Sequence, residues 1–138
     1  MSEGDILLRS SSRLVEDRLA PELAVEPIAY DDLRCFGWLR GIRETALMLE
    51  LRQKTGNIVA IGYGWVDGLE FDPSEGIFLD VGDRRIHIRG RNLNAELRPG
   101  VRLFEGIVRH RVPWIREIDL AQSMEADPRA CIVESIDW

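Results

Sequence analysis

The feature that most constrains this chain is a run of segments with a sequence period of two, between Ala46 and Leu97. Apolar residues alternate with polar ones in 46–52, 77–81 and 84–90, as they do along half-buried β-strands. Turn sequences with glycine separate these segments, and such residues tolerate the backbone angles of tight turns. They are Lys54-Thr-Gly-Asn57, Asp72-Pro-Ser-Glu-Gly76 and Gly82-Asp83. The pattern predicts four or five consecutive antiparallel strands, a β-meander.

A further strand is expected from Ile58 to about Phe71, and its composition predicts a bend. Small residues lie on one of its faces, whereas larger residues occupy the other. A row of small residues allows a strand to bend sharply, as at the corners of small barrels. The small set is Ala60, Gly62 and Gly64, and the large set is Val59, Ile61, Tyr63 and Trp65. Residues 92–97 could continue the strand at 84–90 or form a fifth strand.

Beyond Pro99-Gly100 the apolar spacing becomes helical and predicts a helix over about 101–111, which ends before Pro113. Shorter helical segments are expected at 12–19 and 31–39, and a last strand at 131–136. The expected core combines strand and helix positions: Leu47, Leu49, Leu51, Ile61, Ile77, Leu79, Ile86, Ile88, Leu103, Phe104, Ile107 and Val108.

These elements predict an α+β fold in one domain, residues 1–138. Its centre is a strongly bent antiparallel β-meander at 46–97, barrel-like and of the Sm or SH3 kind. The helix at 101–111 and an N-terminal helical segment cover this meander. Residues 1–45 and 112–138 flank it.

The cellular location of the protein is predicted from its cysteine spacing and from the lack of signal-peptide and membrane-spanning patterns in the sequence. Cys35 and Cys131 stand 96 positions apart, which favours two buried thiols in a reducing compartment over a disulfide scaffold. The first residues lack the basic start and apolar centre of a signal peptide. The longest uncharged stretch, 55–66, is too short to span a bilayer. We therefore expect a cytoplasmic protein with no membrane association.

Charge is distributed unevenly along the chain, although its net value is only −6. Segment 84–116 holds nine arginines against two glutamates, whereas both ends are acidic. Within it, four basic residues occur at every second position, so one strand face would carry them about 6.6 to 6.8 Å apart. This spacing suits the phosphates of an extended single strand. Single-stranded RNA or another polyanion could bind this row, which consists of Arg85, His87, Arg89 and Arg91.

Two other interpretations of these charges stay open. The arginines could pair with the acidic ends of the chain or with carboxylates of the neighbouring hairpin. A bent sheet also leaves edge strands that a protein partner or a second copy of the chain could cover, so a protein-interaction or oligomerisation module is a full alternative.

Enzymatic chemistry finds little support in the sequence. No serine stands in a G-x-S-x-G or S-x-x-K context, and His87 and His110 lack the spacing of metal ligands. We predict no catalytic residue, no metal and no cofactor. A Mg²⁺-dependent nuclease is the remaining alternative, because six carboxylates gather in one region, although turns and arginine pairing account for them. They are Asp67, Glu70, Asp72, Glu75, Asp80 and Asp83.

Residues 86–93, Ile-His-Ile-Arg-Gly-Arg-Asn-Leu, resemble the second motif of the Sm and Sm-like (Hfq-type) barrels, an I-R-G-x-N-hydrophobic run between the last two strands. Residues 72–79 occupy the register of the first motif, D-x-x-M-N-x-x-L. The resemblance covers about 46–97 and implies a small β-barrel, a ring of chains and RNA binding. Gly76 replaces the base-contacting Asn, so uridine recognition is not implied. Short strings in 36–40 and 103–114 resemble a bacterial family, which implies no function.

Overall fold

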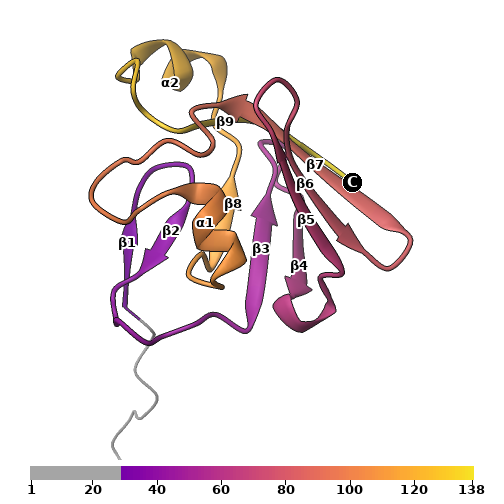
Figure 1. The fold of residues 1–138 in the computed structure, drawn as a ribbon. Coiled ribbons are helices and arrows are strands. Elements are labelled where there is room, and N and C mark those ends of the chain that lie inside the picture. Colours follow the sequence, from indigo (N-terminus) through magenta and orange to yellow (C-terminus); the bar gives the residue numbers. More distant parts are fainter. Residues whose placement is uncertain (1–28) are drawn as a thin grey trace, which may run out of the picture.

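The structure is a computed structural model that describes residues 29–138. Three sheets, two short α-helices and one 3-10 helix make up this part of the chain (Figure 1). Successive strands build the three sheets in turn, and then β8 and β9 join the second and third of them. The helical segment expected at 12–19 lies outside the described residues. In chain order the elements are β1 (Tyr30–Asp32), β2 (Gly37–Leu39), β3 (Met48–Arg52), β4 (Ile58–Gly62), the 3-10 helix η1 (Tyr63–Trp65), β5 (Gly68–Asp72), β6 (Gly76–Val81), β7 (Arg84–Arg91), α1 (Leu103–Val108), β8 (Trp114–Arg116), α2 (Leu120–Glu125) and β9 (Ile132–Asp137).

A small sheet of order β4-β3-β8 is built from two distant parts of the sequence. β3 and β4 form the predicted hairpin, with Leu49 opposite Ile61 and Leu51 opposite Val59. β8 comes from the C-terminal flank and pairs with β3 in parallel. Parallel pairing requires a long connection between the two strands, which the segment between β3 and β8 supplies. No local sequence pattern predicts this pairing. This sheet presents one face to the core and one outward.

The strand expected from Ile58 to Phe71 is interrupted, so that prediction is wrong in the middle. The 3-10 helix η1 breaks it into β4 and β5, which belong to different sheets. The small residues around Gly62 mark the place of this break, because they let the backbone turn and let a neighbouring side chain come close. The bend predicted from the sequence is therefore present, but as a turn of helix and not as a curved strand.

The larger sheet has the order β5-β6-β7-β9 and is antiparallel throughout. Tight turns join β5 to β6 and β6 to β7 as predicted, so this part is a meander. β9 confirms the predicted last strand and completes the sheet beside β7, with a register shift between Arg89 and Gly90. Residues 92–97 form turns and no fifth strand. The segment 46–97 is thus a hairpin in one sheet and a meander in another.

One cluster of buried side chains lies between these sheets and α1. α1 is shorter than expected. It packs closely on β2, since a Cβ placed on Gly106 would lie only 2.5 Å from a ring carbon of Trp38. Two residues predicted in the core are exposed: Leu47, 85% exposed, lies before β3, and Val108, 46% exposed, ends α1. The other predicted core residues are buried, except that Phe104 is partly buried against the cluster.

The helical turn predicted at 31–39 is wrong. These residues form the β1–β2 hairpin, in which Tyr30 pairs with Leu39. Its tight turn places Arg34 at a φ of +76°, which a helix does not permit. In Figure 1 this hairpin and α1 lie on one side of β3, and the larger sheet lies on the other. The sheets of residues 29–138 do not close into a barrel, and none of the helices there is long and apolar enough to cross a membrane.

Candidate functional site

The predicted basic row lies on the outer face of the larger sheet, along β7. Ile86 and Ile88 point into the core, so Arg85, His87 and Arg89 project outward between them. Across the sheet, Arg85 stands opposite Asp80, and His87 stands between Phe78 on β6 and Asp137 on β9. Strand alternation therefore works as predicted here, and the chemistry of the row depends on these neighbours.

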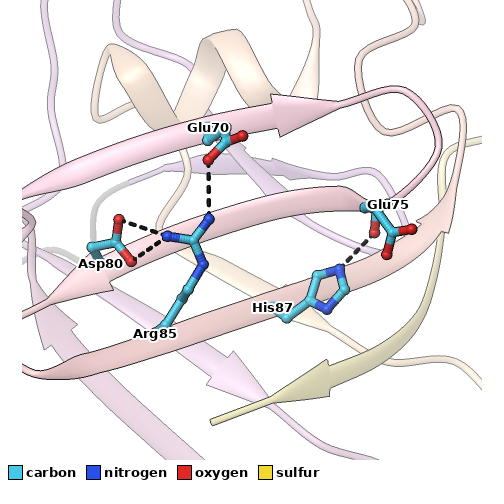
Figure 2. Close-up of polar contacts among 5 residues, drawn as sticks. All are labelled: Glu70, Glu75, Asp80, Arg85 and His87. Carbon is cyan, nitrogen blue, oxygen red and sulfur yellow. Dashed lines mark hydrogen bonds and ion pairs between the residues drawn. The ribbon is translucent and has the colours of Figure 1, made fainter.

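Arg85 is bound by carboxylates of its own sheet. Its guanidinium donates to both oxygens of Asp80, at 3.0 and 3.2 Å, and to Glu70 at 3.0 Å (Figure 2). The same group lies over the ring of Phe78, 4.3 Å from the centroid. Because all these side chains are partly solvated, the ion pairs add little stability, but they occupy the donors that a phosphate would need. This is the pairing with the neighbouring hairpin that the sequence left open.

Both ring nitrogens of His87 have partners within the chain. Its Nε2 lies 2.6 Å from the carbonyl oxygen of Glu75, so this nitrogen carries the proton and donates it (Figure 2). Its Nδ1 accepts from Nε of Arg89 at 3.3 Å. The ring stacks on Phe78 with centroids 4.2 Å apart. With both nitrogens engaged, His87 offers no donor to an anion.

Arg91 leaves the line of the other three residues because the register shifts after Arg89. Its guanidinium donates to the carbonyl oxygen of Ser123 in α2 at 2.8 Å and lies 3.3 Å from the Ser123 hydroxyl. Arg91 thus fastens α2 to the sheet. Within residues 29–138, Arg89 is the one arginine of the row whose terminal guanidinium nitrogens contact no acceptor. The structure therefore does not bring the four side chains together as a free basic row.

Two of the six carboxylates, Asp67 and Asp72, stabilise turns. Asp67 accepts from the backbone N–H of Gly82 at 2.8 Å. Asp72 accepts from the hydroxyl of Ser74 and from the backbone N–H groups of Ser74 and Glu75, and these bonds hold its pKa below the usual range. No group of three potential metal ligands occurs in the part of the chain that the structure describes. The nuclease alternative gains no support from these residues.

A different surface stands out on the outer face of the β4-β3-β8 sheet. Trp65 is 76% exposed, and its indole lies over Gly62, with Cδ1 2.8 Å from the place of a Cβ there. Met48 is directly opposite Gly62 on β3, and its sulfur lies 3.7 Å from the same place. Ile58, 58% exposed, and Ala60 continue this face along β4. Exposed apolar side chains thus lie on one sheet face, beside the ion pair of Glu50 and Arg52.

Aromatic and arginine side chains extend this face across β8. Trp114 lies between the guanidinium groups of Arg52 and Arg116, each 4.9 Å from its ring, and Tyr30 meets it edge to face at 5.9 Å. The buried indole Nε1 of Trp114 has no hydrogen-bond partner among residues 29–138. A hollow of about 320 Å³ lies between β1, β3 and β8, lined by Tyr30, Leu47, Met48, Pro113 and Trp114 among others. We call the surface of Tyr30, Met48, Ile58, Ala60 and Trp65 the apolar face.

No protein-family model, curated protein or solved structure matches this chain. The resemblance of 72–93 to the Sm and Sm-like motifs therefore stays a prediction, as does the role of the basic row. The apolar face has to be interpreted from its own geometry.

Sequence reasoning missed the apolar face because it placed Trp65 wrongly. In a continuous strand Trp65 would share a face with Ile61 and Tyr63 and point into the core. The 3-10 helix changes this alternation, so that Trp65 folds back over Gly62 on the outer side. The available signal was Met48 and Ile58, which stand at outward positions of their strands, where polar residues are expected.

Proposed function

We propose that this domain is a protein-interaction module whose contact surface is the apolar face. The observation that carries the proposal is the exposure of Trp65 beside Met48 on the outer face of the β4-β3-β8 sheet. Single exposed apolar residues are ordinary on monomers, but several on one sheet face, with an indole among them, are typical of contact sites. Trp65 at 76% exposure leaves most of its surface for a partner to cover.

The residue types on and around the apolar face support the same proposal. Tryptophan, tyrosine, methionine and arginine are enriched in protein interfaces relative to other surfaces. The face has Trp65, Tyr30 and Met48. Arg52, which stands opposite Ile58 on β3, already pairs with Glu50 at 3.0 Å. A partner can therefore cover Arg52 without leaving it unpaired. A side chain of the partner can insert into the hollow beside Trp114.

Polyanion binding by the β7 row has weaker support. Carboxylates of Glu70 and Asp80 surround Arg85, and α2 occupies Arg91. A phosphate chain would have to displace these acids while approaching a protein with a net charge of −6. The geometry on the outer face of the larger sheet favours internal pairing.

The proposal is tested by photo-crosslinking in the native cell with a benzophenone amino acid at position 65. Position 108 on α1 is the matched control, because Val108 is also an exposed apolar residue. We expect one crosslinked protein species from position 65, reduced several-fold by Met48→Glu and absent from position 108. The Met48→Glu change places a charge in the apolar face but in no part of the core.

The identity of the crosslinked species decides between partners. A single species, either a different protein or a second copy of this chain, supports the module. Equal and scattered crosslinks from positions 65 and 108 would contradict it. Crosslinks to RNA in place of protein would also contradict it and would restore the polyanion hypothesis.

A further inference from the structure

We infer that the partner is a second copy of this chain, joined to the first by antiparallel pairing of the two β4 strands about a two-fold axis at Ala60. This inference rests on the proposed function, since the new contact includes Trp65 and Ile58 of the apolar face. The paired strands would unite the two small sheets into one continuous sheet of order β8-β3-β4-β4-β3-β8.

The first argument is that β4 has a free edge. Outside the ladder, Gln53 N–H donates to Asn57 C=O at 2.8 Å and Tyr63 N–H to Leu47 C=O at 3.0 Å. Glu50 N–H donates to Pro113 C=O, on the β8 side. The first two of these hydrogen-bonded pairs lie at either end of the β3–β4 ladder, and hydrogen-bonded and non-hydrogen-bonded pairs alternate between them. Within β4, Val59 and Ile61 are therefore the residues whose backbone groups bond to β3.

The backbone groups of the remaining β4 residues therefore point away from β3. These residues are Ile58, Ala60 and Gly62. No strand of residues 29–138 pairs with this edge, and β4 stands last in its sheet. A row of free N–H and C=O groups is thus available to another strand.

The second argument is that β4 lacks the residues that normally prevent edge association. Charged side chains, proline or covering groups protect most natural edge strands. β4 reads Ile-Val-Ala-Ile-Gly, without a charge or a proline. By contrast, the edge strand β5 has two carboxylates, Glu70 and Asp72.

The edge of β9 is also protected. Gln53 donates to the carbonyl oxygen of Ile136 at 2.6 Å, and Glu117 accepts from its N–H at 2.6 Å. β8 is covered by the segment around Cys35 and Phe36, which bonds to Arg116 and Ile115. Among the sheet edges of the β4-β3-β8 and β5-β6-β7-β9 sheets in residues 29–138, β4 therefore stands out as open and unprotected.

The third argument is that β4 is complementary to itself in one register. With Ala60 opposite Ala60 of the second copy, each Ile58 stands opposite a Gly62. The large exposed side chain of Ile58 then meets a residue without a side chain and packs against the indole above it, Trp65. In this register Ile58, Ala60 and Gly62 of one chain are opposite Gly62, Ala60 and Ile58 of the other, as hydrogen-bonded pairs. Each backbone N–H that points away from β3 can then donate to a C=O of the second chain.

Charge permits the same arrangement. Glu50 stands beside Ala60 on β3, so the two Glu50 side chains of the dimer are separated by three strand spacings, about 14 Å. Each Glu50 retains its own Arg52 as ion-pair partner at 3.0 Å. The two Glu50–Arg52 pairs are therefore not brought into contact with each other, although each chain has a net charge of −6.

The register is tested by two cysteine variants of the full chain, Ala60→Cys and Ile58→Cys, with oxidised glutathione as oxidant. The pairing places the two residue-60 Cα atoms about 5.5 Å apart, within disulfide range. It places the two residue-58 Cα atoms about 14 Å apart, beyond that range. Both natural cysteines are buried, so they do not compete. We expect a disulfide-linked dimer from Ala60→Cys and none from Ile58→Cys. A dimer from Ile58→Cys alone would overturn the register.

Association itself is tested by light scattering on the unmodified full chain, from about 1 to 300 μM, where weak homodimers form. We expect a rise from the monomer mass towards twice that value. Ala60→Lys should abolish the rise, because it sets two lysines opposite each other on the edge, whereas Val108→Lys should not. Both variants should keep the circular dichroism spectrum of the parent chain.

A chain that stays monomeric at every concentration, with no disulfide from Ala60→Cys, overturns the second copy as partner. The proposed function fails separately, when position 65 crosslinks to no defined protein. A different protein captured at position 65 would therefore leave the module standing while this inference falls.

Discussion

At the scale of single residues, Tyr63 shows how a polar group is accommodated in the core. Its ring stacks on His110 with centroids 4.3 Å apart, and its hydroxyl donates to the carbonyl oxygen of Val112 at 2.6 Å. Tyr63→Phe should lower the free energy of unfolding by about 1 to 3 kcal/mol, because that buried carbonyl loses its partner. Tyr30→Phe, at a residue that is 43% exposed, should change it by less than about 0.5 kcal/mol. Denaturant titration measures both, and equal effects would contradict this role.

Three buried acids predict the response to alkaline pH. Burial raises the pKa of Cys35, Cys131 and Tyr63 above their ordinary values. Their folded-state pKa values exceed those of the unfolded chain, so the stability that they contribute is complete below the unfolded pKa values and is lost as pH rises. We expect the melting temperature to fall from about pH 9 upward, where unfolded thiols ionise. Cys131→Ala should reduce the slope of this fall, and an unchanged slope would contradict the assignment.

At the scale of elements, the β5–β6 turn depends on Gly76. Its φ is +109°, and a Cβ there would lie 2.2 Å from the carbonyl oxygen of Ile88 on β7. Gly76→Ala should therefore destabilise the fold by more than about 2 kcal/mol. Alanine disfavours this backbone angle, and the backbone of β7 cannot move away from the added Cβ without breaking its pairing. Gly64→Ala is the control, since a Cβ there meets nothing within 4 Å and should be neutral within about 0.5 kcal/mol. Thermal unfolding of both variants checks this difference.

The elements also show which parts of this fold can be predicted from the sequence. β3, β6 and β7 were predictable because their inward residues recur at every second position. β9, Ile-Val-Glu-Ser-Ile-Asp, has no such period, although a last strand was predicted there. The β1–β2 hairpin was not, because three-residue strands are too short to show a period. The pairing of β8 with β3 depends on contacts between distant segments, and the sequence has no local signal for it. The basic residues of β7 were placed on the predicted face, but their carboxylate partners come from β5 and β6 through tertiary structure.

At the scale of the whole molecule, the row on β7 and the apolar face predict different partners. We expect no RNA affinity tighter than about 100 μM at low salt, the range of weak non-specific binders, because Arg85 and Arg91 are occupied. Filter binding with mixed-sequence single-stranded RNA measures this affinity. Tighter binding that is lost in Arg89→Glu would contradict the expectation and would place a polyanion site on β7. Arg89→Glu is preferable to a change at Arg91, which would release α2 from the sheet.

Amide hydrogen exchange of the full chain, followed by NMR at low and high protein concentration, tests the contact surface most directly. In dilute solution the amides of Ile58, Ala60 and Gly62 should exchange rapidly, whereas those of Val59 and Ile61 are protected by β3. On concentration, protection should spread to the first three amides, and the indole signal of Trp65 should shift with them. Rapid exchange of these three amides at every concentration, with an unchanged Trp65 signal, would contradict the claim that β4 and the apolar face join two chains.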